Sequence, residues 1–444
     1  MQTPRTHIVW TRLVTMVPGV DRHHPEPTRA GARRRSGTAP SRLATLAAVA
    51  VGACLGSSSS AEGPVLGWGS NLFGQATSPE SATAVSLSTS HACAIQALTN
   101  AVICWGDDTY GKATPPASVN GTLGSGIAIA IGTSHSCAIQ NGTGAVVCWG
   151  SNGSGQASPP DSVNGTPGTA SAIAVAGAAS CAIQTSTGAV VCWGANGSGQ
   201  TTPPPSLNGT SGTAAAIALA QDHGCAVQAG SGAVICWGNG FHGETTPPPA
   251  VNGTPGTATA ISVGLDHSCA IQAGTAAVVC WGRNNFLQAT PPPTVDGTTG
   301  TAVALSAGAG GVHSCAIQTG TGAVVCWGYG YYGAATPPPS VDGSIGTAAA
   351  VVAGWTSTCA IQAEGGAVVC WGINISGEVI PPAALRGTRV TAIAAGSGHS
   401  CAIEAGTGAV LCWGRDDMGQ AVLVIGVFVG GRWDGRWCDG REVA

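Results

Sequence analysis

The chain has 444 residues, a formal net charge of −4, 44% hydrophobic residues and only 8% charged residues. This composition excludes an intrinsically disordered chain, because many apolar side chains with little net charge can bury a core. The 69 glycines show no period of three, which excludes collagen. Abundant Gly and Pro, with few Leu, Glu and Lys, argue against a helical bundle and favour a β-rich chain with many turns.

Residues 1–42 form a basic extension, and residues 43–54 have the pattern of an export signal. Arg33–Arg35 and Arg42 precede an apolar stretch, Leu43–Ala53, that is too short to span a bilayer. The stretch runs into Cys54 through a sequence that resembles a bacterial lipobox, and residues 55–64 form a Ser-rich tether. We therefore expect export to the bacterial cell envelope or secretion. Cys54 is either the lipidated residue or an incidental thiol near an ordinary cleavage site.

Residues 65–421 contain one unit that repeats eight times, at steps of 42 to 46 residues. In each unit a Cys is followed eleven residues later by a second Cys, and a Trp-Gly pair comes directly after it. The Cys pairs are Cys93–Cys104, Cys137–Cys148, Cys181–Cys192, Cys225–Cys236, Cys269–Cys280, Cys315–Cys326, Cys359–Cys370 and Cys401–Cys412. A ninth Trp-Gly, at Trp68, precedes the first full unit. A period in the forties indicates a propeller or a solenoid.

One unit, residues 258–290, shows how the repeat divides into strands. Residues 258–264, 267–272 and 277–282 are short, rich in Ile and Val, and separated by turn residues. Gln288 begins a fourth strand, and Pro291–Pro293 belong to an outer edge or a connection because Pro donates no backbone hydrogen bond. The fold class that we predict is an all-β propeller with four short strands per blade, and eight blades are favoured over seven.

The last unit carries the motifs of a known repeat. Residues 393–403 contain a Gly-x-x-His-Ser element, and residues 413–420 contain Trp-Gly followed by Gly-Gln. Together they resemble the repeat of the regulator of chromosome condensation family, and the resemblance covers about residues 65–421. It implies a β-propeller, usually of seven blades, whose members include nucleotide exchange factors, domains of ubiquitin ligases and a secreted β-lactamase inhibitor. This chain departs from the family in its paired Cys and its eight units.

The sequence leaves open how a propeller would close. Val65–Thr77 could pair with the first strands of the last unit, which would make residues 409–421 surplus. Alternatively the last unit stays whole and Val65–Thr77 lies outside. Residues 422–444 break the repeat as an irregular tail, and they contain an unpaired Cys438.

Hairpin geometry predicts a disulfide in each unit. If Gln272 and Ala277 close a hairpin as a hydrogen-bonded pair, Cys269 and Cys280 lie directly opposite, with Cα atoms ~4.5 Å apart, which suits a disulfide. Zinc is the alternative, since six units carry a His two residues before the first Cys, but no fourth ligand recurs. We expect eight disulfides, no metal and no cofactor. Each His should satisfy backbone groups at the turn after the first strand, and each Trp should pack between blades with its N–H bonded to backbone.

The units differ from one another mainly at two places, the turn between the first two strands and the connection after Trp-Gly. In an up-and-down blade both lie on one face, which we predict to be a binding surface because aromatic side chains in exposed loops on a rigid scaffold are typical of one. The candidate binding residues are Tyr110, Phe241, His242, Phe286, Tyr329, Tyr331, Tyr332 and Trp355, accompanied by Asp107, Asp108, Asp416 and Asp417.

The function predicted from the sequence is that of a monomeric, exported or lipid-anchored protein-binding scaffold. Residues 65–421 carry a net charge of −9 without a basic stripe, which argues against nucleic acid and, apart from a lipid anchor, against a membrane. No catalytic motif is recognisable, so we do not expect an enzyme. A secreted enzyme inhibitor is the alternative, ahead of a carbohydrate-binding propeller or an enzyme with a site in the central channel.

Overall fold

The computed structural model describes residues 81–418 except 167, 309–310 and 331. The predictions for the N-terminal extension, Cys54, Val65–Thr77 and Cys438 lie outside the described residues. The described part is built from eight antiparallel sheets of three strands each, in which the second strand is always central. No helix of the described part is long and apolar enough to cross a membrane.

The strands follow the repeat units in chain order. They are β1 (Ala82–Leu87), β2 (His91–Gln96), β3 (Val102–Gly106); β4 (Gly126–Ile131), β5 (His135–Gln140), β6 (Val146–Gly150); β7 (Ala170–Ala176), β8 (Ala179–Gln184), β9 (Val190–Gly194); β10 (Ala214–Leu219), β11 (His223–Gln228), β12 (Val234–Gly238); β13 (Ala258–Val263), β14 (His267–Gln272), β15 (Val278–Gly282); β16 (Ala302–Ala307), β17 (His313–Gln318), β18 (Val324–Gly328); β19 (Ala348–Ala353), β20 (Ser357–Gln362), β21 (Val368–Gly372); and β22 (Val390–Ala395), β23 (His399–Glu404), β24 (Val410–Gly414). Two 3-10 turns, η1 (Thr109–Gly111) and η2 (Ala383–Leu385), lie in connections.

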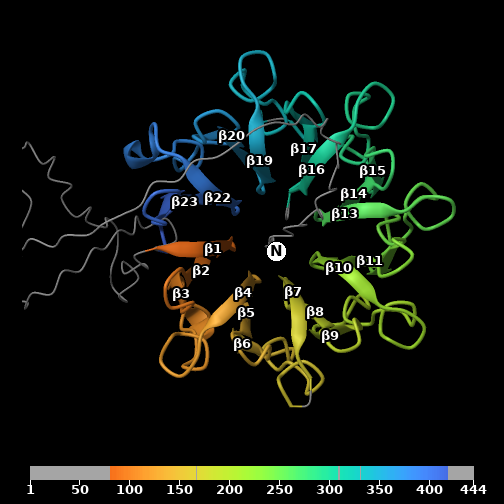
Figure 1. Ribbon diagram of the computed structural model, residues 1–444, viewed down its shortest axis with the longest axis vertical. Helices are drawn as coiled ribbons and strands as arrows, with labels where there is room; N and C mark the ends of the chain where they lie inside the picture. The colour runs from red at the N-terminus through yellow and green to blue at the C-terminus, as the bar shows by residue number, and fades with distance from the viewer. Residues whose placement is uncertain (1–80, 167, 309–310, 331, 419–444) are drawn as a thin grey trace, which may run out of the picture. The chain divides into compact units, whose positions relative to one another are not determined.

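The eight sheets lie side by side in chain order, with the first strand of each sheet nearest a common centre (Figure 1). The first strands of successive sheets pack against one another, and β1 also packs against β22 and β23 of the eighth sheet. The backbone N–H of Ala82 donates to the carbonyl of Gly408 at 2.7 Å. The eighth sheet therefore packs against the first.

The predicted fourth strand is wrong: each sheet has three strands. The segment that begins at Gln288 forms turns instead, and the N–H of Thr290 donates to the carbonyl of Leu287 at 3.1 Å. The prolines that follow supply no N–H for a ladder. After the prolines, the carbonyl of Val295 accepts a hydrogen bond at 2.8 Å from the N–H of Val278, at the start of β15. The Pro-rich segment is thus a connection.

In the eighth sheet β24 pairs with β23 along its length. The core explains why neighbouring sheets pack so closely. Side chains on the central strand alternate between two faces, so that Cys93 and Ile95 pack toward the second sheet, while Ala92 and Ala94 pack toward the eighth.

Candidate functional site

The predicted disulfides are present in all eight sheets. In the fifth sheet the N–H of Gln272 donates to Ala277 O at 2.8 Å, and Cys269 lies directly opposite Cys280. The two Cα atoms are 4.0 Å apart, and the other seven pairs have Cα separations of 4.0 to 4.1 Å. These sulfur atoms are bonded to each other, so they are not available as metal ligands.

The buried His residues have a structural role, but their partners differ from the prediction. The His91 Nε2 atom lies 2.9 Å from Ser136 Oγ on the next sheet, and His135 Nε2 lies 2.8 Å from Ser180 Oγ. The same link joins three further pairs of sheets: His223 to Ser268, His267 to Ser314, and His313 to Thr358. The expected contacts were backbone groups at the turn, whereas the observed bonds to Ser and Thr join neighbouring sheets.

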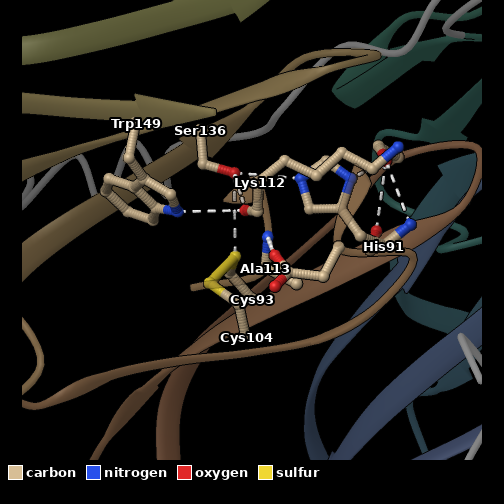
Figure 2. Close-up of a disulfide and its surroundings, with 9 residues drawn as sticks. His91, Cys93, Cys104, Lys112, Ala113, Ser136 and Trp149 are labelled. Carbon is tan, nitrogen blue, oxygen red and sulfur yellow. Dashed lines mark hydrogen bonds between the residues drawn. A yellow bond between two sulfur atoms is a disulfide. The ribbon is translucent and has the colours of Figure 1, made fainter. Parts of the chain in front are cut away.

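The repeat Trp residues also join neighbouring sheets, as predicted. The Nε1–H of Trp149 donates to Lys112 O at 3.0 Å, and Ser136 Oγ donates to the same carbonyl at 3.1 Å (Figure 2). Six further Trp residues donate to the equivalent carbonyl of the preceding unit: Trp193, Trp237, Trp281, Trp327, Trp371 and Trp413. Within the described residues Trp105 Nε1 is the exception, since it is buried without a partner.

Burial keeps the His imidazoles uncharged. Desolvation lowers the pKa of His135, His223 and His313 to about 4 and that of His267 to about 3. A neutral imidazole can donate from one nitrogen only, which suits a single link to a hydroxyl group. Across the described ranges, no three His, Cys, Asp or Glu side chains gather closely enough to hold a metal ion.

The two variable places of the repeat lie together at one end of the strands. The backbone N–H of Asp107, after β3, donates to Ser90 O, in the turn between β1 and β2, at 2.8 Å. In the fifth sheet the backbone N–H of Arg283 donates to Asp266 O, also at 2.8 Å. We call this set of turns and connections the variable face. The turns between second and third strands lie at the other end of the antiparallel strands, and with the Gly-Thr connections before each first strand they form the Gly-Thr face.

The structure exposes most of the predicted aromatic residues on the variable face. Phe241 is 84% exposed, Tyr110, His242, Phe286 and Tyr332 are also exposed, and Tyr329 and Trp355 are half-buried. The Tyr331 prediction lies outside the described residues. The Phe286 and Tyr329 ring centroids are 4.8 Å apart, and those of Tyr329 and Tyr332 are 6.4 Å apart. The structure therefore joins aromatic side chains from the fifth and sixth sheets.

Leu287 is an exposed apolar residue that sequence reasoning missed. It is 62% exposed and lies next to Phe286. Its φ of 63° is in the left-handed region, where the equivalent positions of six other units hold Gly with φ from 73° to 89°. The signal was available in the sequence, because Leu287 is the position that reads Gly in the other repeats.

Charged side chains on the variable face are mostly paired. Lys112 Nζ lies 2.6 Å from Asp107 Oδ2, and Arg283 lies 3.0 Å from Asp266 Oδ2. Partial burial by itself would raise the pKa of Asp107, but hydrogen bonds from Lys112 and Thr109 outweigh it and lower the pKa to about 2. Arg415 pairs with Asp417.

The variable face and the first strands of the sheets differ in chemistry. The eight first strands, as the structure describes them, contain no titratable residue. An enzyme needs unlike groups that converge on a reacting atom, and these strands offer none. The variable face offers exposed apolar rings and carboxylates instead, which are suited to contacts with a macromolecule.

Comparisons with known proteins give one family and several solved structures. The chain matches the model of the regulator of chromosome condensation (RCC1) repeat at residues 127–156 and 390–420. No curated protein matches the sequence. The chain is similar to the CRINKLY WD40 ectodomain of the receptor kinase ACR4 from Arabidopsis thaliana, with 23% identity, 68% of this chain and 98% of that chain covered, and a TM-score of 0.46.

Two other solved structures are similar to this chain at comparable identity, coverage and TM-score. The ectodomain of the receptor kinase CR4 from Physcomitrella patens is 22% identical, over 69% of this chain and 77% of that chain, with a TM-score of 0.47. Prp20p from Saccharomyces cerevisiae is 16% identical, over 71% of this chain and 80% of that chain, with a TM-score of 0.44. The matched segment 127–156 runs from the second residue of β4 to the residue whose carbonyl accepts the next Trp N–H. Both matched segments thus carry the regulator of chromosome condensation (RCC1) repeat.

Proposed function

We propose that this protein is an exported eight-bladed propeller that binds another protein through its variable face. The observation that carries the proposal is the exposure of large apolar side chains at the connections after Trp-Gly. In the second and third sheets the equivalent tips hold only Gly and Ser, as at Ser154 and Ser198. The fold therefore does not need an apolar residue there, and exposed aromatic rings on a rigid scaffold are suited to contacts with a partner.

Export is supported by the disulfides. Eight disulfides point to an extracellular or secreted protein, because the cytosol keeps most protein thiols reduced. We further propose that Cys54 is lipidated, which would tether residues 65–421 to the cell envelope through the Ser-rich segment 55–64. The support for this anchor is the apolar stretch Leu43–Ala53 and the residues just before Cys54.

Eight blades are supported by the packing of the eighth sheet against the first. Each three-stranded sheet would then be one blade of a ring. A ring built this way presents all eight variable turns and connections on one side. This would give a partner a broad, rigid surface whose shape does not depend on the partner's presence.

A quantitative pull-down from the native cell envelope tests the proposal. The test variant is Phe241→Ser with Tyr332→Ser on the variable face. The matched control is Leu123→Ser with Ile345→Ser, two residues that are 82% and 85% exposed on the Gly-Thr face. We expect the test variant to lose partners that the control variant keeps. If the control variant loses the partners and the test variant keeps them, the binding face is the wrong one.

A further inference from the structure

Leu287 adopts a backbone conformation that disfavours its own side chain. It occupies the fourth position of a tight turn in which its N–H donates to Asn284 O at 3.2 Å. In the second sheet Gly155 makes the equivalent bond to Asn152 O at 3.0 Å, with φ of 78°. Left-handed backbone is unfavourable for a residue with a branched side chain and is uncommon outside Gly. The turn itself therefore favours Gly at position 287.

Packing of the Leu287 side chain within the fold offsets little of this unfavourable backbone energy. It is 62% exposed. A strained residue that does not stabilise its own fold is a reason to look for a function. The exposed Leu287 is therefore better explained by a contact with another molecule than by a contact within the chain.

Leu287 belongs to a continuous apolar ridge, which we define as Phe286, Leu287, Tyr329 and Tyr332. The rings of Phe286 and Tyr329 meet edge to face, with an interplanar angle of 68°. Tyr329 also lies edge-on to Tyr332, at 74°. Edge-to-face contacts between rings are favourable, and the contact between Phe286 and Tyr329 joins the fifth and sixth sheets.

Carboxylates lie in the turns of the fourth and fifth sheets on the variable face. Asp266 is paired with Arg283, but within the residues that the structure describes Asp222 has no basic side chain at ion-pair distance. Burial and, to a lesser extent, the Asp266 carboxylate raise the pKa of Asp222. A cation brought by a partner would relieve this repulsion.

We propose that the ridge is the docking site for a protein partner whose complementary surface is an apolar groove with a basic side chain at its border, placed to pair with Asp222. This deepens the proposed function, on which it rests, by placing the contact at the fifth and sixth sheets instead of around the whole variable face. Leu287 and Phe286 enter the groove, and the carboxylate of Asp222 sets the orientation of the partner.

The first test needs no partner. Leu287→Gly should lower the equilibrium constant for unfolding about fivefold, because it removes the left-handed strain. The matched control is Gly333→Leu, at the equivalent position of the sixth sheet, where φ is 79° and a Cβ atom would meet nothing within 4 Å. This control should raise the unfolding constant about fivefold. A Leu287→Gly variant that is less stable than the parent would show that Leu287 serves the fold and would overturn the proposal.

The second test identifies and uses the partner. A photo-crosslinking benzoylphenylalanine replaces Phe286 in one strain, Tyr110 in a second and Ile345, on the Gly-Thr face, in a third. The protein captured at Phe286 is then purified and used as the probe in binding titrations. We expect Leu287→Gly to raise its Kd about tenfold or more, as truncation of a central apolar contact does. Asp222→Asn should weaken binding and reduce its salt dependence, while Ile345→Gly should change the Kd less than twofold.

The outcomes separate the two proposals. If crosslinks form from Tyr110 but not from Phe286, or if Leu287→Gly leaves the Kd unchanged, the ridge proposal is wrong and the broader function stands. If crosslinks form from Ile345 only, both proposals are wrong.

Discussion

The buried His residues should make the protein sensitive to mild acid, and His135 offers the clearest test. Burial lowers the pKa of His135 from 6.5 to about 4. The unfolded chain therefore binds a proton more readily than the folded protein does. The contribution of His135 to stability is fully present above pH ~6.5, decreases as the pH falls, and is lost completely near the folded pKa.

The size of the effect follows from the two pKa values. With pKa values of 6.5 unfolded and about 4 folded, the free energy of unfolding decreases by about 2 kcal/mol between pH 7.5 and pH 5.0 through His135 alone. A loss of this size is a large fraction of the stability of a typical domain. Five His residues form equivalent links to a neighbouring sheet, so the whole protein should be markedly less stable at pH 5.0.

The perturbation is the double variant His135→Ala with Ser180→Ala. It removes both partners of one link, and other sheets have Ala at the same positions, as at Ala179 and Ala92. The double variant should be less stable than the parent at pH 7.5, because it leaves a cavity. Its further loss on going to pH 5.0 should be about 2 kcal/mol smaller than that of the parent.

The assay is unfolding in guanidinium chloride, followed by Trp fluorescence at both pH values with the disulfides intact. Carboxylates titrate in parent and variant alike, so the difference between the two proteins isolates His135. Ser180→Ala alone is the control, and it should retain the pH dependence of the parent. If the double variant loses as much stability as the parent between the two pH values, His135 is not a buried neutral group and the reasoning fails.

Three further predictions concern the disulfides, the repeat Trp residues and the anchor. Peptide mapping without reduction should recover only disulfide bonds within units, and a bond between different units would contradict the pairing. Removing the Cys137–Cys148 bond by a double Ala substitution should reduce the free energy of unfolding by up to ~3 kcal/mol, because the bond closes a loop of about twelve residues. Trp281→Phe should reduce the free energy of unfolding by about 1–3 kcal/mol, because the carbonyl of Glu244 loses its indole donor at 2.8 Å; equal midpoints for variant and parent in denaturant would argue against that bond. Cys54→Ser should move the protein from the membrane fraction to the soluble envelope fraction, and unprocessed protein in the cytosol would refute export.

The strand pattern could be read from the sequence because it depends on local rules. Period-two alternation and a four-residue turn place Cys269 opposite Cys280 with no knowledge of neighbouring sheets. The predicted fourth strand from Gln288 was wrong because these residues form turns before the Pro-rich connection, where backbone donors are missing.

The His–hydroxyl links between sheets could not be predicted from a single unit because their partners are far apart in sequence. His91 and Ser136 are 45 residues apart, and a single repeat unit does not show which His meets which hydroxyl group. A comparison of the units does show which residues pair. The third sheet has Ala179 instead of His, and the fourth sheet, which would supply its partner, has Gly224 instead of Ser. Leu287 was missed for a different reason, since a search for aromatic residues overlooks a position where the unusual feature is the absence of Gly.

The acceptor for each repeat Trp is a main-chain carbonyl, and this separates architecture from specificity. Lys112, Gln156, Glu244 and Ala334 all present the same oxygen atom to the next Trp, although their side chains differ in size and charge. Mutation can therefore replace the residues of this connection without removing the bond that fixes the next sheet. The connections behave as exchangeable cassettes, so new recognition surfaces could evolve, or be grafted by design, one connection at a time on an unchanged frame.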